Sequence, residues 1–508
     1  MSARTRARLA DTLPDLMPNL FPGQFPGRGE NTPLDLPAVD ATTAKQIGEL
    51  FTSPEFDAWS ESLAKVKNCV RPIRLHGSSQ TLEVATGAIV SSYSSRQEPL
   101  GITLVPCGNR RESVCPACSR VYAGDMFHLI RAGVVGGKTV PDTIVENPLV
   151  FATVTAPSFG AVHGRHSDGR CHWRAVGRCR HGRPISCQDR HPADDPVLGQ
   201  PLCVECYDYA SQIVWQWWAP DLWRRFTITL RRLVAKTLDV PASRLGEVAT
   251  VQYAKVAEYQ LRGAVHFHAL IRLDGPRTRE GFAAAPAGID PAQLALLVEQ
   301  AARSVRLTVP GVDQHDPPRL LAFGRQVDAR PVRTSRRTDD PDRALSPGQV
   351  AGYLAKYATK AADDTGTRDN PHHHRLRATG RRLAARAHQA DAGTTEEGPY
   401  ELLGKWVHML GFRGHFASKS RRYSITLGAL RRARRRAQAL IAESRAEGRP
   451  LDLAALETDL LADDESDTTL VIGHWSYAGT GWRTDAERVL ATAAAARARE
   501  YDHRRAEQ

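Results

Sequence analysis

The alternation of apolar and polar positions along the chain is most regular at residues 249–273. Two β-prone runs, TVQYAKVAEYQ and VHFHALIRL, flank a short turn at LRGA, and this pattern predicts a β-hairpin. A third β-prone run, NPLVFATVTAP at 147–157, predicts a central strand. Apolar residues at helical spacing predict helices at 46–75, 207–240 and 291–308. The chain therefore combines strands with helices.

A further helix is predicted for SPGQVAGYLAKYATK at 346–360. Ser346 suits the N-cap, Pro347 suits the first helical position, and Gln349 completes a capping box with Ser346. Four other stretches are rich in polar residues, Gly and Pro, and we expect them to be irregular. They are a disordered lead-in at 1–45, loops at 160–200 and 313–345, and a linker or insertion at 363–400.

The net charge of the 508 residues is +12, which favours an anionic polymer such as nucleic acid as partner. Basic residues gather after residue 400, in a region predicted to be mostly helical. Its arginine cluster at 431–436 fits either a solvated helix face or a phosphate-contacting surface. The candidate DNA-binding residues of this region are Arg421, Arg422, Arg431 and Arg435.

No apolar run is long enough for a membrane span, and no apolar signal-peptide region follows the basic N-terminus. We therefore expect a cytoplasmic protein. In that reducing compartment, the nine cysteines are expected to be metal ligands or buried thiols rather than disulfides.

Two histidines lie one residue apart in the second strand of the predicted hairpin. Side chains in a strand alternate between faces, so His266 and His268 point the same way and can hold a divalent metal. Glu258 on the preceding strand is a candidate third ligand. A three-residue loop places Glu258 opposite His266, whereas a two-residue loop turns it to the other face. Gln260 is the next candidate.

Two tyrosines on the helix predicted at 346–360 are candidate nucleophiles. Tyr353 and Tyr357 are four residues apart and share one face, and Lys356 and Lys360 form a second such pair beside them. A phenol with a pKa near 10 attacks poorly unless cations assist it. The two lysines can lower that barrier or hold a scissile phosphate.

The cysteines suggest zinc binding. The sequence Cys115-Pro-Ala-Cys118 is a tight knuckle that aims both sulfurs at one point, and Cys203 and Cys206 begin the helix at 207–240. We expect these four residues to share one zinc site and Cys69 to be an ordinary buried thiol. A second zinc site is predicted from Cys107, Cys179, His181 and Cys187, with Cys171 and His191 as competing ligands.

Together these motifs resemble the HUH endonucleases, named for His-hydrophobe-His. HFH followed by aliphatic residues resembles the metal motif, YLAKYATK resembles the tyrosine motif of two-tyrosine initiators, and FATVTAP resembles the strand that precedes them. More closely, the chain resembles the RepSA-type rolling-circle replication initiators of actinomycete plasmids and integrative conjugative elements. PLCVECYDYASQIVWQWWAPDLWRRFT, AEYQLRGAVHFHALIRLDG and GFRGHFASKSRRYS carry that likeness over roughly residues 100–435.

The resemblance implies an α+β fold with a central antiparallel sheet that carries the HUH strand, and with helices on one face. The cysteine positions add an interleaved zinc module, because the strand at 147–157 lies between its two halves, and the pattern after residue 400 adds a helical C-terminal region. It implies that His266, His268 and Glu258 hold Mg or Mn, and that Tyr357 attacks DNA to give a 5′-phosphotyrosine. Tyr353 would make a second attack that ends the round. The implied partners are origin DNA and the host helicase and DNA polymerase.

The organisation expected from these motifs has five parts. They are the lead-in at 1–45, an N-terminal region with the first half of the zinc module at 46–148, a nicking domain at 149–362 with a zinc-binding loop at about 163–206, a linker at 363–400, and the basic region at 401–508. Two other functions fit the same motifs: an HUH transposase with a zinc module, and a non-catalytic zinc-dependent DNA-binding regulator.

Overall fold

In the computed structural model, the chain folds into two compact units. Met1–Gly124 and Glu457–Gln508 together form one, which we call the end unit, and Asp125–Leu456 forms the other, the central unit. The region predicted at 401–508 therefore contributes to both units. The residues that the structure describes are 36–98, 100–138, 140–165, 169–172, 175–279, 281–332, 348–355, 370–392, 397–448 and 469–507.

The end unit is built on a four-stranded antiparallel sheet in which β11 and β2 flank β1, and β3 also pairs with β1. Its core contains Trp59, Leu63 and Leu490. Its strands are β1 (Ile73–Glu83), β2 (Ile89–Ser94), β3 (Thr103–Val105) and β11 (Thr469–Thr480), and its helices include α2 (Ala41–Thr52), α3 (Phe56–Lys65) and α12 (Asp485–Glu507). Helix α4 (Pro116–Val135) begins in this unit and ends in the central unit. The helices predicted at 46–75 are confirmed as α2 and α3, but the end of that range, from Ile73, belongs to β1. The lead-in prediction is wrong for its last residues, because α2 begins at Ala41 with Asp40 as its N-cap.

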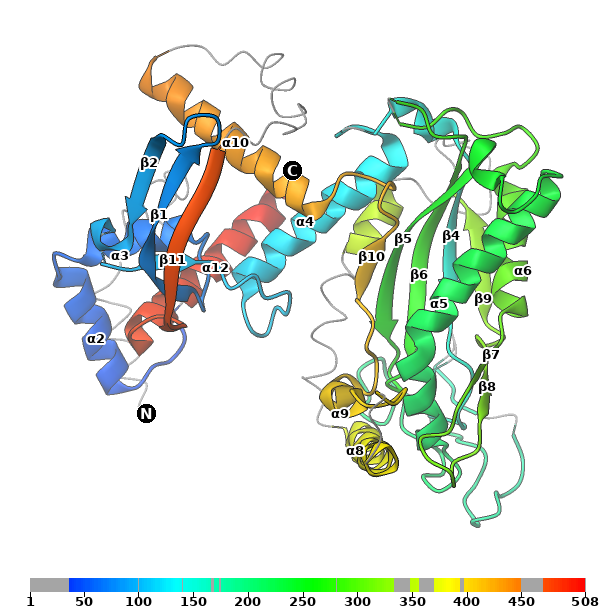
Figure 1. Ribbon diagram of the computed structural model, residues 1–508. Coiled ribbons are helices and arrows are strands. Elements are labelled where there is room, and N and C mark those ends of the chain that lie inside the picture. Colours follow the sequence, from blue (N-terminus) through cyan, green and yellow to red (C-terminus); the bar gives the residue numbers. More distant parts are fainter. Residues whose placement is uncertain are drawn as a thin grey trace. The chain divides into compact units, whose positions relative to one another are not determined.

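The central unit contains a five-stranded sheet in the order β10-β5-β6-β4-β9, with every neighbouring pair antiparallel (Figure 1). The central antiparallel sheet is therefore confirmed, as are the hairpin at 249–273 and the strand at 147–157. The strands of this unit are β4 (Leu149–Val154), β5 (Thr250–Tyr259), β6 (Val265–Asp274), β7 (Leu307–Val309), β8 (Arg319–Leu321), β9 (Val327–Pro331) and β10 (Ala417–Lys419). Its helices include α5 (Tyr209–Thr237), α6 (Pro291–Ser304), α8 (Pro371–Asp391), α9 (Leu403–Trp406) and α10 (Leu427–Ala446).

The two faces of strand β6 differ in chemistry. Phe267, Ile271 and Leu273 are buried in the core that contains residues of α5 and α6, and the tryptophans of α5 pack into the same core. The side chains at the alternate positions of β6, among them His266 and His268, point to the opposite face. One face of the sheet is thus sealed by helices, and the other carries the polar residues considered below.

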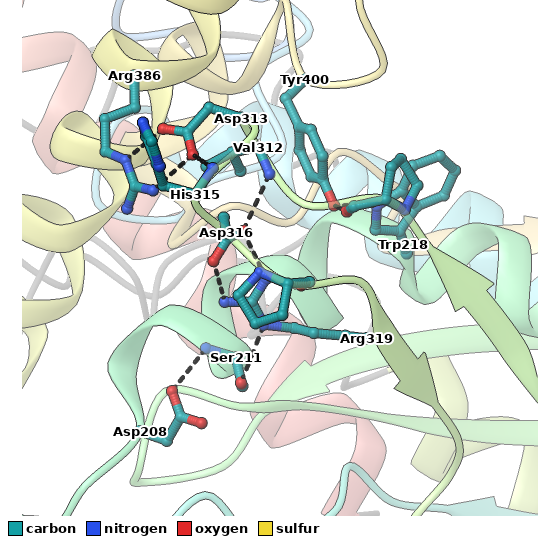
Figure 2. Close-up of polar contacts among 12 residues, drawn as sticks. Asp208, Ser211, Trp218, Val312, Asp313, His315, Asp316, Arg319, Arg386 and Tyr400 are labelled. Carbon is teal, nitrogen blue, oxygen red and sulfur yellow. Dashed lines mark hydrogen bonds and ion pairs between the residues drawn. The ribbon is translucent and has the colours of Figure 1, made fainter.

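A polar network fixes the start of α5 to the loop between β7 and β8 (Figure 2). Arg319 donates to both carboxylate oxygens of Asp316 at 2.6 and 2.7 Å, and to Ser211 in the first turn of α5 at 3.2 Å. Asp313 accepts from Arg386 of α8 at 2.7 and 2.8 Å. These bonds hold α5, α8 and the loop together.

Two stretches predicted to be irregular contain regular elements. The linker prediction for 363–400 is wrong for the part occupied by α8, which is capped by Asn370 and buries Leu376 and Leu383. These two leucines are seven residues apart and share a helix face, but the surrounding basic residues masked the pattern. The loop predicted at 313–345 contains β8 and β9, and β9 is an edge strand of the central sheet.

A buried ion pair supports the polar face of β6. Arg272 and Asp274 are fully buried, and Arg272 donates to the two oxygens of Asp274 at 2.6 and 2.8 Å. Arg272 also donates to the Gly133 carbonyl of α4, and Asn147 donates to Asp274 at 2.8 Å. The pair therefore ties the end of α4 to the sheet.

We expect Arg272→Met to lower the unfolding free energy of the central unit by about 3–5 kcal/mol, because it leaves the Asp274 carboxylate buried without a cation. Thermal unfolding followed by calorimetry measures the change. The matched control is Arg330→Met, which removes an exposed ion pair with Asp328 and should shift the transition little. Equal shifts for both variants would contradict a stabilising role for the buried pair.

Candidate metal and DNA-processing site

The turn of the β5–β6 hairpin sets the register of the site. Gln260 donates its N–H to the Ala264 carbonyl at 2.9 Å, which closes a three-residue loop, and Gly263 in that loop has a φ of 71°. A left-handed glycine is typical of such loops. The register places Glu258 directly opposite His266. The three-residue alternative is therefore confirmed, and Gln260 instead accepts a bond from Arg262 at 2.9 Å.

Glu258, His266 and His268 converge on one point. Glu258 Oε2 lies 3.0 Å from His266 Nε2 and 3.3 Å from His268 Nε2. One ligand atom from each of the three residues falls within 4.8 Å of the others. Two imidazoles and one carboxylate form a common divalent-metal set, and three protein ligands leave positions open for a substrate. The residues therefore fit a catalytic metal better than a closed structural one.

Thr153 of β4 orients one of these histidines. Its hydroxyl lies 3.0 Å from His268 Nδ1, and Thr153 and His268 are register partners in the sheet. If Nδ1–H donates to Thr153, the lone pair of His268 Nε2 is free to bind a metal ion beside the Glu258 carboxylate. No sequence motif marks Thr153, because its place beside His268 depends on the register between β4 and β6.

The protonation states also suit a metal site. Burial would raise the pKa of Glu258, but the hydrogen bonds with His266 and His268 outweigh it and lower the pKa to about 2. Burial lowers the pKa of His268. At neutral pH Glu258 is therefore ionised and His268 is neutral, as metal coordination requires.

Tyr353 lies against this group of ligands. Residues 348–355 are helical, and the Tyr353 ring stands edge-on to His268 and Phe151, with centroids 5.4 and 5.7 Å away. The side chain is 39% exposed. The structure thus brings one predicted nucleophile to the metal-binding face. Tyr357, Lys356 and Lys360 lie outside the described residues.

The cysteines and histidines assemble differently from the prediction. The predicted pairing of Cys115 and Cys118 with Cys203 and Cys206 is wrong, as is the second predicted set. Cys69 is a member of a cluster and not an isolated thiol. The three groups are Cys69, Cys107, Cys115 and Cys118; His163, Cys171, Cys187 and His191; and Cys179, His181, Cys203 and Cys206. The earlier pairing failed because spacing identifies neighbours within a knuckle but not its partner knuckle.

The candidate DNA-binding arginines are not equivalent. Arg421, Arg422 and Arg435 are exposed. Arg431 donates to the buried carboxylate of Asp125 at 2.8 Å. Arg434 contacts the same carboxylate at 2.6 Å, so two arginines of α10 anchor that helix to α4. Part of the arginine cluster thus has a structural role that the charge pattern did not reveal.

Comparisons with known proteins agree over most of the chain. A family model described as RepSA, "Replication initiator protein, pSAM2", matches residues 55–496. A "Replication initiator protein" from Streptomyces ambofaciens is 40% identical over 464 residues, which cover 89% of this chain and 93% of that protein. No solved structure matches the chain. In the described part of the chain, no helix has the length and apolarity needed to cross a membrane.

Proposed function

Because this chain belongs to the RepSA family of replication initiator proteins, we propose that it initiates replication of a plasmid or integrative element by nicking one strand of origin DNA. The proposed enzyme is an HUH-type nickase and strand transferase. It acts in the cytoplasm, with the host helicase and DNA polymerase as further partners, and its central sheet serves as the HUH core.

One observation carries this proposal. The ligand atoms of Glu258, His266 and His268 converge on the face of the central sheet opposite the α5–α6 core, and Tyr353 lies edge-on to His268 on that same face. A metal-binding group beside a half-exposed phenol is the arrangement that a tyrosine attack on DNA phosphate needs. A DNA-binding regulator without catalysis does not require this arrangement.

In the proposed reaction, Tyr357 Oη attacks the scissile phosphorus. The new Oη–P bond gives a 5′-phosphotyrosine and the P–O3′ bond breaks. The phenol gives up its proton to solvent, and the departing O3′ takes up one to become the 3′-OH that primes synthesis. Lys356 and Lys360 hold the phosphate. Tyr353 makes the second attack, at the regenerated origin, and frees a new 3′-OH. This 3′-OH attacks the Tyr357 phosphotyrosine, so that the released strand is closed, the Oη–P bond breaks and Tyr357 becomes a free phenol again.

His266, His268 and Glu258 would hold Mg or Mn in this site. When bound, such a cation polarises the scissile phosphate and stabilises its developing charge. The sheet holds the ligand side chains in position before DNA binds, because Thr153 contacts His268 and the hairpin register sets Glu258 opposite His266.

A covalent-adduct assay tests the proposed function. The full chain is incubated with Mn and labelled single-stranded fragments that tile the DNA around its own gene, and the products are denatured. A protein–DNA band that requires one fragment and disappears with chelator supports the nickase. Tight binding to a fragment without any adduct or cleavage would favour a non-catalytic regulator.

The exposed arginines after β10 are expected to contact DNA phosphates. Replacing both Arg421 and Arg422 by Ala should reduce the slope of log affinity against log salt by about 2. Fluorescence anisotropy at several salt concentrations measures this slope. Arg431→Ala is the comparison variant, because its pairing with Asp125 predicts lower stability and an unchanged slope. An unchanged slope in the double variant would remove these two residues from the DNA interface.

A further inference from the structure

All nine cysteines of the chain fall into three four-residue groups with three histidines. The groups contain four, two and three cysteines, and every cysteine is a free thiol. In each group, four ligand atoms lie within 4.8 Å of one another. We propose that each group holds one structural zinc ion, and that the two groups between residues 163 and 206 form a single cross-braced module.

The separations within the groups match tetrahedral zinc. Ligand atoms about 2.0–2.3 Å from a tetrahedral ion lie about 3.3–3.8 Å from one another. Cys69 Sγ lies 3.8 Å from Cys115 Sγ, Cys187 Sγ lies 3.5 Å from His191 Nε2, and Cys203 Sγ lies 3.6 Å from His181 Nδ1. A disulfide needs sulfurs about 2.05 Å apart. The thiols are therefore spaced for an ion rather than for a bond.

Neighbouring groups support the ligands as they do in metal sites. His191 Nδ1 lies 2.8 Å from an Asp195 oxygen while its Nε2 faces Cys187, so the carboxylate fixes the ring for coordination. Gly164 N–H donates to Cys171 Sγ at 3.3 Å, and Cys107 N–H donates to Cys69 Sγ at 3.3 Å. Such bonds favour the thiolate form that zinc requires.

The order of ligands along the chain interleaves the two groups of the central unit. His163 and Cys171 are followed by Cys179 and His181 of the other group, then by Cys187 and His191, and finally by Cys203 and Cys206. Pairs one and three therefore share one site, and pairs two and four share the other. The ligands of each site are separated in the chain by a ligand pair of the other site. The two ions would therefore hold the same loop together.

This loop has little regular structure of its own. Among its described residues, 155–208 form no helix or strand, and only isolated bridges occur, such as Val162 with Pro201. Segments of this length without regular structure are uncommon in compact domains. The large apolar side chains among its described buried residues are Phe159, Leu198 and Tyr207. Metal binding can supply the missing folding free energy.

The module abuts the hairpin that carries the candidate metal ligands. A side chain at Gly199 would come within 2.4–2.7 Å of the backbone of Leu261 and Arg262. Arg262 in turn donates to the carbonyls of Pro157 and Ala156 at 2.8 and 3.0 Å. The braced loop thus supports the turn that sets Glu258 opposite His266.

Native mass spectrometry of the full chain tests the stoichiometry. Glu258→Gln protein is used alongside the wild type, so that zinc at the nicking site is not counted. We expect three zinc ions per chain in the variant, with the nine thiols protected from a thiol reagent until a zinc chelator releases all three ions. Two or fewer ions, or reactive cysteines in the zinc-loaded protein, would overturn the proposal.

Ligand variants test the grouping. Cys69→Ser should lose one ion and leave the other two unaffected. His163→Gln should also lose one ion. It should speed release of the ion at Cys179, His181, Cys203 and Cys206 at least about tenfold, because the brace is shared.

His172→Gln is the matched control, since His172 Nδ1 lies 3.3 Å from Cys171 Sγ but His172 is not a member of the group. Loss of zinc in this control but not in His163→Gln would overturn the assignment, and unchanged release at the second site would overturn the cross-brace. Limited proteolysis of each variant shows whether its loss of zinc comes from global unfolding.

Discussion

Full-length protein carrying Tyr357→Phe is expected to form no covalent adduct with origin DNA. Phenylalanine keeps the ring but lacks the oxygen that forms the bond to phosphorus. Tyr353→Phe is expected to keep the first cleavage and the adduct but to lose the second strand transfer that closes the released strand. Denaturing gels of end-labelled origin DNA measure the adduct and the closed product separately.

The conservative replacement at Tyr353 suits this comparison. Its ring packs edge-on to His268 and Phe151, and a phenylalanine retains both contacts. Loss of the adduct in Tyr353→Phe with retention in Tyr357→Phe would reverse the proposed order of attack. An adduct that survives in the double variant would exclude both tyrosines as nucleophiles.

Glu258→Gln is expected to lower the cleavage rate at the origin at least about a hundredfold at a fixed Mn concentration. The amide preserves the shape of the side chain but removes the negative charge that stabilises a divalent cation. Raising the Mn concentration should restore part of the rate, while the affinity for DNA stays close to that of the wild type. Initial rates over a series of Mn concentrations measure both effects.

Glu247→Gln is the matched control for that variant. Glu247 is an exposed carboxylate of the same unit, and it pairs with Arg244 rather than with the candidate metal ligands. It should cleave at the wild-type rate. A Glu258→Gln protein that cleaves equally well at limiting Mn would show that the carboxylate takes no part in metal binding.

The hairpin could be predicted from sequence because its signals are local. Alternation placed His266 and His268 on one face, and only the number of residues in the loop decided whether Glu258 lay opposite His266. Edge strand β9 was missed because Asp328 and Arg330 alternate with Val327 and Ala329 at the sheet edge, a pattern that also suits a surface loop. The packing of Phe151 and Thr153 beside His268 depends on register between distant strands.

The metal-ligand groups were harder to predict because their members come from separate segments. Two cysteines in a knuckle belong together by spacing, but spacing does not say which distant knuckle completes the set. Cys69 lacks any nearby cysteine, and it joins Cys107, Cys115 and Cys118 only through the fold of the end unit. Asp125 likewise receives Arg431 and Arg434 from about 300 residues away, which no local charge pattern reveals.

The pairing of β1 with β11 bears on how the protein is made. His76 and Ser476 are neighbours in the end unit but lie 400 residues apart in the chain. A ribosome adding about 5–20 residues per second needs about 20–80 s to cover that distance. The central unit is complete in the nascent chain before β11 emerges, so it can fold while β1 still waits for its partner. Cells that stop translation after Leu456 would therefore release a chain with every proposed nicking residue but without a finished end unit.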